Sequence, residues 1–166
     1  MNYFDFFGLP HKLHLDPKDL ESRFYALSKQ WHPDRFARAS PEQKRVSEDA
    51  TATLNDGYRT LKEPLLRAEY VLKEHGLDLK STVVPPELLE EVFELNMALE
   101  EAERSQLEAA KARFAAMSED LDRNLFGEFA AYDQTQDKAI LDNIRAILNK
   151  RKYISNLVQQ VEKALA

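Results

Sequence analysis

Apolar residues recur at helical spacing along most of this chain, and this periodicity constrains the fold more than any other feature. In the C-terminal half they form three long rows, with short breaks near Glu103 and at Asp133-Gln134. The rows are Leu88, Val92, Leu95, Leu99 and Ala102; Leu107, Ala110, Phe114, Met117, Leu121, Leu125 and Phe129; and Ile140, Ile144, Ile147, Ile154, Val158, Val161 and Leu165. Three such rows predict a three-helix bundle or an antiparallel coiled coil. An alternating β pattern is found nowhere in the sequence, so we predict an all-α fold.

The N-terminal part carries two further helical rows. Leu20, Phe24, Leu27 and Trp31 follow one another at i, i+4, i+7 and i+11, which predicts a helix from Pro17 to Trp31. A second helix is expected from Pro41 to Leu61. Its apolar row consists of Val46, Ala50, Leu54, Tyr58 and Leu61. Two amphipathic helices of this kind can bury their rows against each other as an antiparallel hairpin, flanked by short helices near Tyr3 and Pro64.

Residues 76–86 form a predicted connector between the two parts. Gly76 suits the end of a helix, and Pro85-Pro86 prevents a helix from continuing through them. We therefore predict one domain over residues 1–75 and a second, the three-helix domain, over residues 87–166.

The tripeptide His32-Pro33-Asp34 lies between the two N-terminal helices. Proline disfavours helical geometry in the residue before it and fixes its own φ, so the first helix should end here and the two polar side chains should project from a stiff turn. A polar tip without walls is poorly suited to catalysis and well suited to contact with another protein. The alternative is an ordinary solvated loop.

Four segments in this part resemble the J-domain family. Residues 2–9, NYFDFFGL, resemble the family's first helix, and Trp31 and Arg35-Phe36 flank the tripeptide as the family's residues do. Residues 55–61, NDGYRTL, and 64–70, PLLRAEY, resemble the end of the third helix and the fourth. The ending RAEYVL and the acidic helical extension behind it resemble the HscB-type co-chaperones of iron–sulfur cluster assembly within that family.

The resemblance implies a tip that binds a DnaK-type ATPase chaperone. The expected contacts are His32, Pro33, Asp34, Arg23, Lys29, Arg35 and Arg38. Asp34 would pair with an arginine of the chaperone, and a carboxylate–guanidinium pair gives direction as well as attraction. The basic residues would steer toward an acidic partner, although each can also be part of a solvated helix face. Tyr25 and Ala26 stand where a generalist J-domain often has lysine and arginine, which favours a dedicated chaperone.

The first C-terminal helix carries a second apolar row, Leu89, Phe93 and Met97, beside its core row. A surface helix needs only one buried apolar face, so a second apolar row that is flanked by carboxylates indicates a docking surface for a partner. The resemblance implies that the iron–sulfur scaffold protein binds here. The expected contacts are Leu89, Glu90, Phe93, Glu94, Met97, Glu101 and Tyr153. The alternative is that Leu89 and Phe93 pack under the connector or against the N-terminal domain.

Composition and motifs argue against several other functional classes of protein. The net charge of −6 lies wholly in residues 76–166, so the basic footprint of a nucleic-acid binder is lacking. No stretch has the composition of a transmembrane helix, and no secretory signal is visible. There is no phosphate-binding loop and no nucleophile elbow, so we predict a protein that is not an enzyme and needs no cofactor.

Cysteine is absent, which excludes disulfides and thiolate metal sites and is compatible with the reducing cytoplasm, where we place the protein. His11 and His14 with Asp16 are too few ligands for a zinc site, so we predict no metal. The predicted function is a co-chaperone that delivers the scaffold protein to the chaperone and stimulates its ATPase. Two alternatives are a J-domain co-chaperone for another client, with the bundle as a client-binding or dimerisation module, and a helical enzyme using His32 and Asp34.

Overall fold

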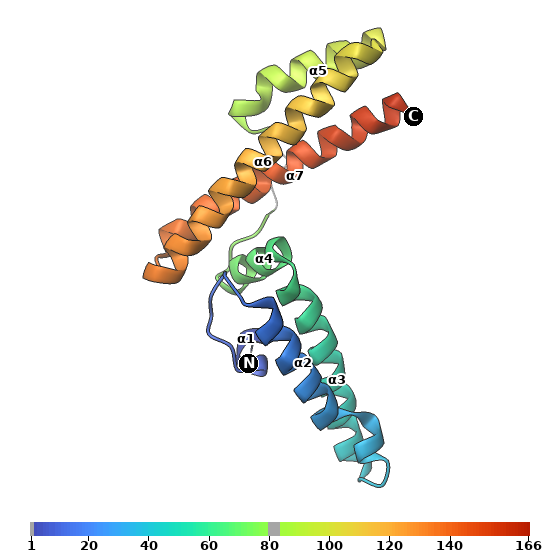
Figure 1. Ribbon diagram of the computed structural model, residues 1–166, viewed down its shortest axis with the longest axis vertical. Coiled ribbons are helices and arrows are strands. Elements are labelled where there is room, and N and C mark those ends of the chain that lie inside the picture. The colour runs from blue at the N-terminus through green and yellow to red at the C-terminus, as the bar shows by residue number, and fades with distance from the viewer. Residues whose placement is uncertain (1, 80–83) are drawn as a thin grey trace. The chain divides into compact units, whose positions relative to one another are not determined.

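The computed structural model describes residues 2–79 and 84–166, and every regular element in these two stretches is a helix. Figure 1 shows the order of the helices along the chain. The described chain divides into two compact units at Gly76 and Leu77. The predicted all-α fold is confirmed. Part of the predicted connector, residues 80–83, lies outside the described residues.

The N-terminal unit contains α1 (Tyr3–Phe7), α2 (Pro17–Trp31), the 3₁₀ turn η1 (Pro33–Phe36), α3 (Pro41–Lys62) and α4 (Pro64–Glu74). Local sequence explains the starts of the two long helices. The Asp16 carboxylate accepts from the Lys18 N–H, and Ser40 and Gln43 form a reciprocal capping box. A proline follows each cap, at the position where its missing N–H costs nothing.

The core of this unit joins α1 to the α2–α3 hairpin and to α4. Its buried side chains include Phe4, Phe7, Leu13, Leu20, Leu54, Leu61, Ala68 and Leu72. Gly57 permits the close approach of α1 to α3, because a Cβ there would lie 3.0 Å from both Tyr3 Cδ1 and Phe7 Cε2. One predicted core residue is wrong: Val46 is 53% exposed, and the neighbouring Ser47 is buried instead. Toward the tip, a hydrogen bond from Ser47 to the end of α2 replaces apolar packing.

The C-terminal unit contains the short turn η2 (Pro86–Leu88), α5 (Leu89–Glu101), α6 (Arg104–Thr135) and α7 (Lys138–Leu165). Ala102 and Gln136 adopt the left-handed conformation, with φ of 54° and 56°, and end α5 and α6 close to the predicted breaks. The Asp137 carboxylate accepts from the Ala139 N–H and starts α7.

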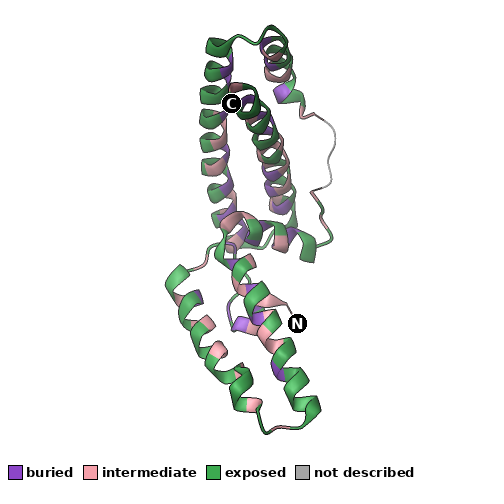
Figure 2. Ribbon diagram, turned by 90° about the vertical axis from the view of Figure 1, so that its right-hand side faces the viewer, coloured by how far each residue is buried: buried purple, intermediate pink, exposed green. Residues whose placement is uncertain are grey.

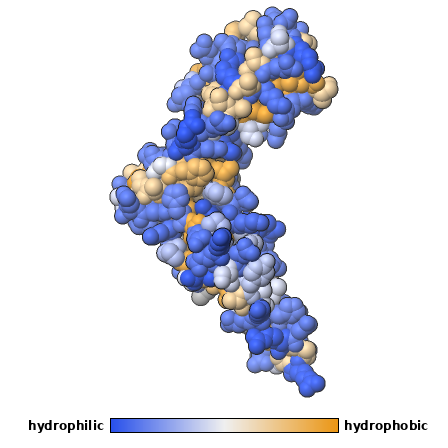
Figure 3. Space-filling model, in the orientation of Figure 1, coloured by the Kyte–Doolittle hydropathy of each residue, from blue (hydrophilic) through white to orange (hydrophobic). Residues whose placement is uncertain are grey.

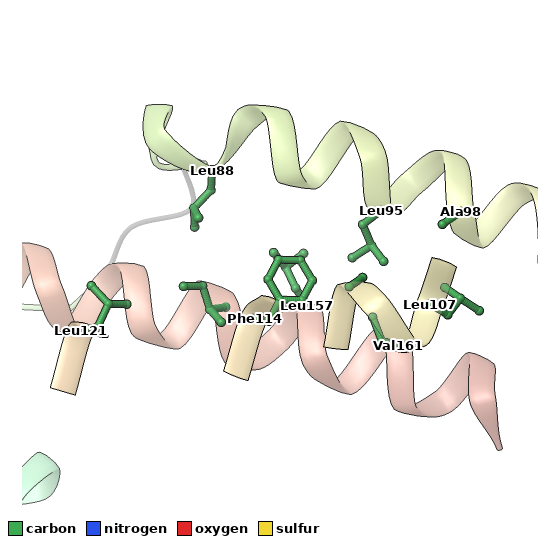
Figure 4. Packing of buried hydrophobic residues seen from close by; sticks show 10 residues of the cluster. Leu88, Leu95, Ala98, Leu107, Phe114, Leu121, Leu157 and Val161 are labelled. Atoms are coloured by element: carbon green, nitrogen blue, oxygen red, sulfur yellow. The ribbon is translucent and has the colours of Figure 1, made fainter. Parts of the chain in front are cut away.

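The three helices share one buried cluster. In Figure 4, Leu88 of η2 and Leu95 and Ala98 of α5 face Phe114 of α6 and Val161 of α7. The face that α7 buries differs from the prediction. Its buried residues are Leu141, Ile144, Leu148, Ile154, Leu157 and Val161, whereas the predicted Ile140, Ile147, Val158 and Leu165 are half-buried. Ile144, Ile154 and Val161 of the predicted row are buried, and Leu141, Leu148 and Leu157 complete the buried face.

An ion pair joins α7 to α6. Arg151, at a seam position of α7, is held by Asp122 of α6, with 2.6 Å between Nε and Oδ1. Ala102, predicted at the end of a buried row, is exposed because the helix has already ended there. Across the described residues, no helix combines the length and apolar character needed to cross a membrane.

Candidate functional site: an exposed polar tip and an unpartnered helix face

The polar tip consists of His32, Pro33 and Asp34, on the turn that connects α2 to η1. His32 leaves the helix with a ψ of 133°, and Pro33 opens the 3₁₀ turn. The ring Nδ1 of His32 accepts from the Asp34 N–H at 3.1 Å, and the Asp34 Oδ2 lies 3.6 Å from the same nitrogen. The Asp34 side chain is 92% exposed and that of His32 57%. Both polar groups are therefore presented to solvent from a fixed backbone.

The backbone behind the tip is anchored to α3. The Trp31 carbonyl accepts from the Ser47 hydroxyl at 2.8 Å and from the Thr51 hydroxyl at 3.2 Å. The rings of Trp31 and Phe36 stack at 6.0 Å with an interplanar angle of 8°, which ties η1 back to the end of α2. These contacts satisfy a carbonyl that the end of the helix would leave free.

The basic residues near the tip differ in what they contact. Lys29, Arg35 and Arg38 are exposed, and Arg35 Nη1 reaches the Lys29 carbonyl at 3.4 Å. Arg23 is instead engaged within the unit: its Nη1 donates to the carbonyls of Phe7 and Gly8 at 3.1 and 2.9 Å. Its Nε also donates to Asp19 at 3.1 Å. Arg23 thus fastens α1 to α2, a role that sequence reasoning missed, and its contact with a chaperone stays a prediction.

The outer face of α5 is the second candidate surface. Leu89, Phe93 and Met97 are 57%, 66% and 47% exposed, while Leu95 on the opposite side is 1% exposed. Figure 2 shows the same division, with exposed residues on one side of the helices and buried residues on the other. Neither Leu89 nor Phe93 is covered by described residues, so the predicted second apolar row is present on the surface.

Carboxylates flank this row. Glu90, Glu94 and Glu101 are exposed, and Glu94 Oε2 accepts from Arg113 Nη1 of α6 at 3.0 Å. Hydrophobic and hydrophilic residues are likewise interspersed on the face of the protein that Figure 3 displays. Tyr153 of α7 is half-buried and packs against the shared core cluster. Its part in a docking surface stays a prediction.

A groove runs between α5 and α6 beside the row. It has a volume of about 440 Å³ and is lined by Glu94, Met97, Ala98, Glu101, Gln106, Ala109, Ala110 and Arg113. The contacts expected from the sequence include Glu94, Met97 and Glu101 on the α5 side of this groove. On the α6 side only Ala110 belongs to a predicted row. Gln106, Ala109 and Arg113 share one helix face, but only the packing of α5 on α6 reveals which face meets the second row.

The N-terminal histidines do not assemble a metal site. His11 Nε2 lies 2.7 Å from Asp5 Oδ1, and this hydrogen bond lowers the pKa of the Asp5 carboxyl below its ordinary value of 3.8. Within residues 2–79 and 84–166, no three histidine or acidic side chains converge in a way that could hold a metal ion.

Comparison with known proteins relates this geometry to a family. The chain is 37% identical to the co-chaperone protein HscB homolog of Vibrio cholerae, over 98% of this chain and 96% of that protein. It is 35% identical to the corresponding homolog of Aliivibrio salmonicida, with the same coverage. The chain belongs to the HscB family. The family described as the HscB C-terminal oligomerisation domain matches residues 84–162.

Solved HscB structures have the same fold. The chaperone HscB from Vibrio cholerae is 34% identical and superposes with a TM-score of 0.69 over the full length of both chains. Human co-chaperone protein HscB is 27% identical, with a TM-score of 0.73 over 98% of this chain and 81% of the human one. The resemblance to an HscB-type J-domain protein, inferred from the sequence, is confirmed.

Proposed function

We propose that this HscB-family protein is a cytoplasmic adaptor of iron–sulfur cluster assembly. In this proposal the polar tip binds a DnaK-type chaperone and stimulates its ATPase, while the outer face of α5 binds the scaffold protein on which clusters are built. The exposure of Asp34 on a fixed turn, in a chain of this family, is the observation that carries the proposal.

The tip would act through directed polar contacts. The exposed Asp34 carboxylate can pair with a guanidinium of the chaperone, and the hydrogen bond from the Asp34 N–H to His32 holds the backbone from which the carboxylate projects. Contacts made more strongly with the hydrolysing state of the chaperone would shift its population toward that state. The ATPase groups belong to the chaperone, so this protein is an activator and not an enzyme.

The α5 face would act by apolar contact with an acidic fringe. An exposed phenylalanine and its two neighbours in the row can be desolvated by a partner without any change in the bundle beneath them. Holding scaffold and chaperone on one chain raises the effective concentration of the scaffold at the chaperone's substrate site. The proposed delivery step needs no covalent chemistry.

The test is an ATPase assay with the purified partner chaperone, with and without the scaffold protein. The wild-type chain should stimulate hydrolysis, and stimulation should rise further with scaffold present. His32→Gln should lose stimulation while keeping its helical circular dichroism and its scaffold affinity. Undiminished stimulation by His32→Gln would contradict the proposal, and turnover without any chaperone would favour the enzyme alternative.

A second role is favoured by one finding: the family matching residues 84–162 is described as an oligomerisation domain. On this alternative the α5 face joins copies of the chain. Light scattering across a range of protein concentrations decides between them. A dimer that Phe93→Asp dissociates would assign the face to self-association, and a monomer that binds scaffold would leave the adaptor role in place.

A further inference from the structure

The groove between α5 and α6 adjoins the exposed row, which lies on α5 alone. Met97 and Ala98 form its wall on α5, and Ala109 and Ala110 form its wall on α6. Small side chains on the α6 side leave this space open, since an alanine fills little of the gap between two packed helices. Met97 lines the groove and is also the last member of the exposed row. The groove and the row therefore form one continuous surface.

The two ends of the groove differ in charge. At one end Glu94 is paired with Arg113, so that carboxylate is neutralised within the protein. At the other end Glu101 lies beside Gln106, and no described residue forms an ion pair with Glu101. The apolar middle thus leads from a neutral end to an acidic end. A partner segment would gain most by placing a cation at Glu101 and an apolar side chain between the two alanine-bearing walls.

From this arrangement we infer that the surface for the scaffold protein extends from the exposed row through the groove and onto α6, an inference that rests on the proposed function. The occupant of the groove is a segment of the scaffold that carries an apolar side chain close to a lysine or arginine. Arg113 determines specificity by occupying Glu94, which leaves Glu101 as the open carboxylate of the groove. The binding surface is then contributed by two helices, α5 and α6, and not by α5 alone.

The apolar part is tested by filling the groove. Ala109→Phe places a ring between the helices, and Ala115→Phe places the same ring on an exposed position of α6 that does not line the groove. Binding of purified scaffold protein to the full chain is measured by calorimetry, with Phe93→Asp as the reference that should abolish binding. Ala109→Phe should weaken binding by about tenfold or more, which is about 1.4 kcal/mol, and Ala115→Phe by less than about twofold. Thermal melts of both variants show that the bundle is intact.

The charged part is tested by salt dependence. Glu101→Gln should weaken binding by about threefold and flatten the dependence of affinity on salt, while Glu119→Gln, elsewhere on α6, should change neither. Arg113→Ala frees Glu94 and should strengthen binding at low salt with a steeper salt dependence. Weaker binding by Arg113→Ala would overturn the assignment of a cationic segment.

The outcomes separate this inference from the function on which it rests. If Phe93→Asp abolishes binding and Ala109→Phe leaves it unchanged, the groove is not used and the proposed function stands. If the wild-type chain does not bind scaffold at all, both fall. Loss of binding with Ala109→Phe but not with Ala115→Phe supports the two-helix surface.

Discussion

The tip and the outer face of α5 are both exposed, but they differ in what holds them in place. The tip is a short turn that depends on specific hydrogen bonds, such as those to the Trp31 carbonyl, because little apolar core lies beneath it. The α5 face is the back of a helix whose other side is fully packed. The tip can therefore present charge from a fixed backbone, and α5 can present apolar area without loss of stability. Each suits a different kind of partner.

The largest expected effect is on the free energy of unfolding, which should respond very differently to substitutions on the two sides of α5. Leu95→Ala removes a side chain that is 1% exposed and should lower the free energy of unfolding by about 2–5 kcal/mol. Phe93→Ala removes a larger side chain that is 66% exposed and should change it by no more than about 0.5 kcal/mol. Urea unfolding followed by circular dichroism measures both. A large loss of stability with Phe93→Ala would mean that the outer face is part of the core.

The next prediction concerns the tip alone. Asp34→Asn keeps the shape of the side chain but removes the charge, and a hydrogen bond to a charged group is worth about 2 kcal/mol. Affinity for the chaperone should fall by about 30-fold and ATPase stimulation with it. Because the Asp34 side chain is 92% exposed, the unfolding curve should not move. Scaffold affinity is the internal control, and its loss would show that the two surfaces are not independent.

These two surfaces also differ in how far the sequence reveals them. The tip is a contiguous motif with a proline that sets its geometry, so its exposure and its place at the end of α2 could be predicted from Trp31 to Asp34 alone. The second row on α5 could be predicted from the spacing of Leu89, Phe93 and Met97. Most of the α6 wall of the groove could not be predicted. Ala110 belongs to the predicted apolar row of this helix, but neither Ala109 nor Arg113 signals that its side of the helix meets a neighbour.

The same limit explains the errors within the fold. Val46 continues a helical row, but periodicity does not show that the contact between α2 and α3 at this point is the hydrogen bond of Ser47, which is buried in its place. Arg23 looked like part of a basic face because its charge is visible in the sequence. Its hydrogen bonds to the carbonyls at the end of α1 depend on a tertiary contact.

A smaller effect is expected from the support of the tip. Ser47→Ala removes one of the two hydroxyls that donate to the Trp31 carbonyl and should cost about 1 kcal/mol of stability. It should also reduce ATPase stimulation in part, since the end of α2 is held less firmly. Thr51→Ser keeps the second hydroxyl and is the matched control. Full stimulation by Ser47→Ala would show that the turn is stiff without its anchor to α3.

The smallest effect concerns a second histidine–aspartate pair in the same unit. His11 and Asp5 are 2.7 Å apart and satisfy each other, whereas His32 Nδ1 and Asp34 Oδ2 are 3.6 Å apart and leave the carboxylate open to a partner. The hydrogen bond from His11 lowers the pKa of Asp5 below 3.8, so its contribution to stability is present above that pH. The contribution is lost as the pH falls through the lowered value, because the unfolded chain then binds the proton more readily.

Acid unfolding followed by circular dichroism tests this difference between the pairs. Asp5→Asn should be less stable than the wild type near neutral pH, and the two curves should converge at low pH, where the wild-type carboxyl is protonated. His11→Phe keeps an aromatic ring against Phe4 but loses the hydrogen bond, and should follow the Asp5→Asn curve. Both variants should stimulate the chaperone normally at neutral pH, because their pair is closed within the unit. A loss of stimulation equal to that of Asp34→Asn would show that activation depends on both pairs and is not confined to the tip.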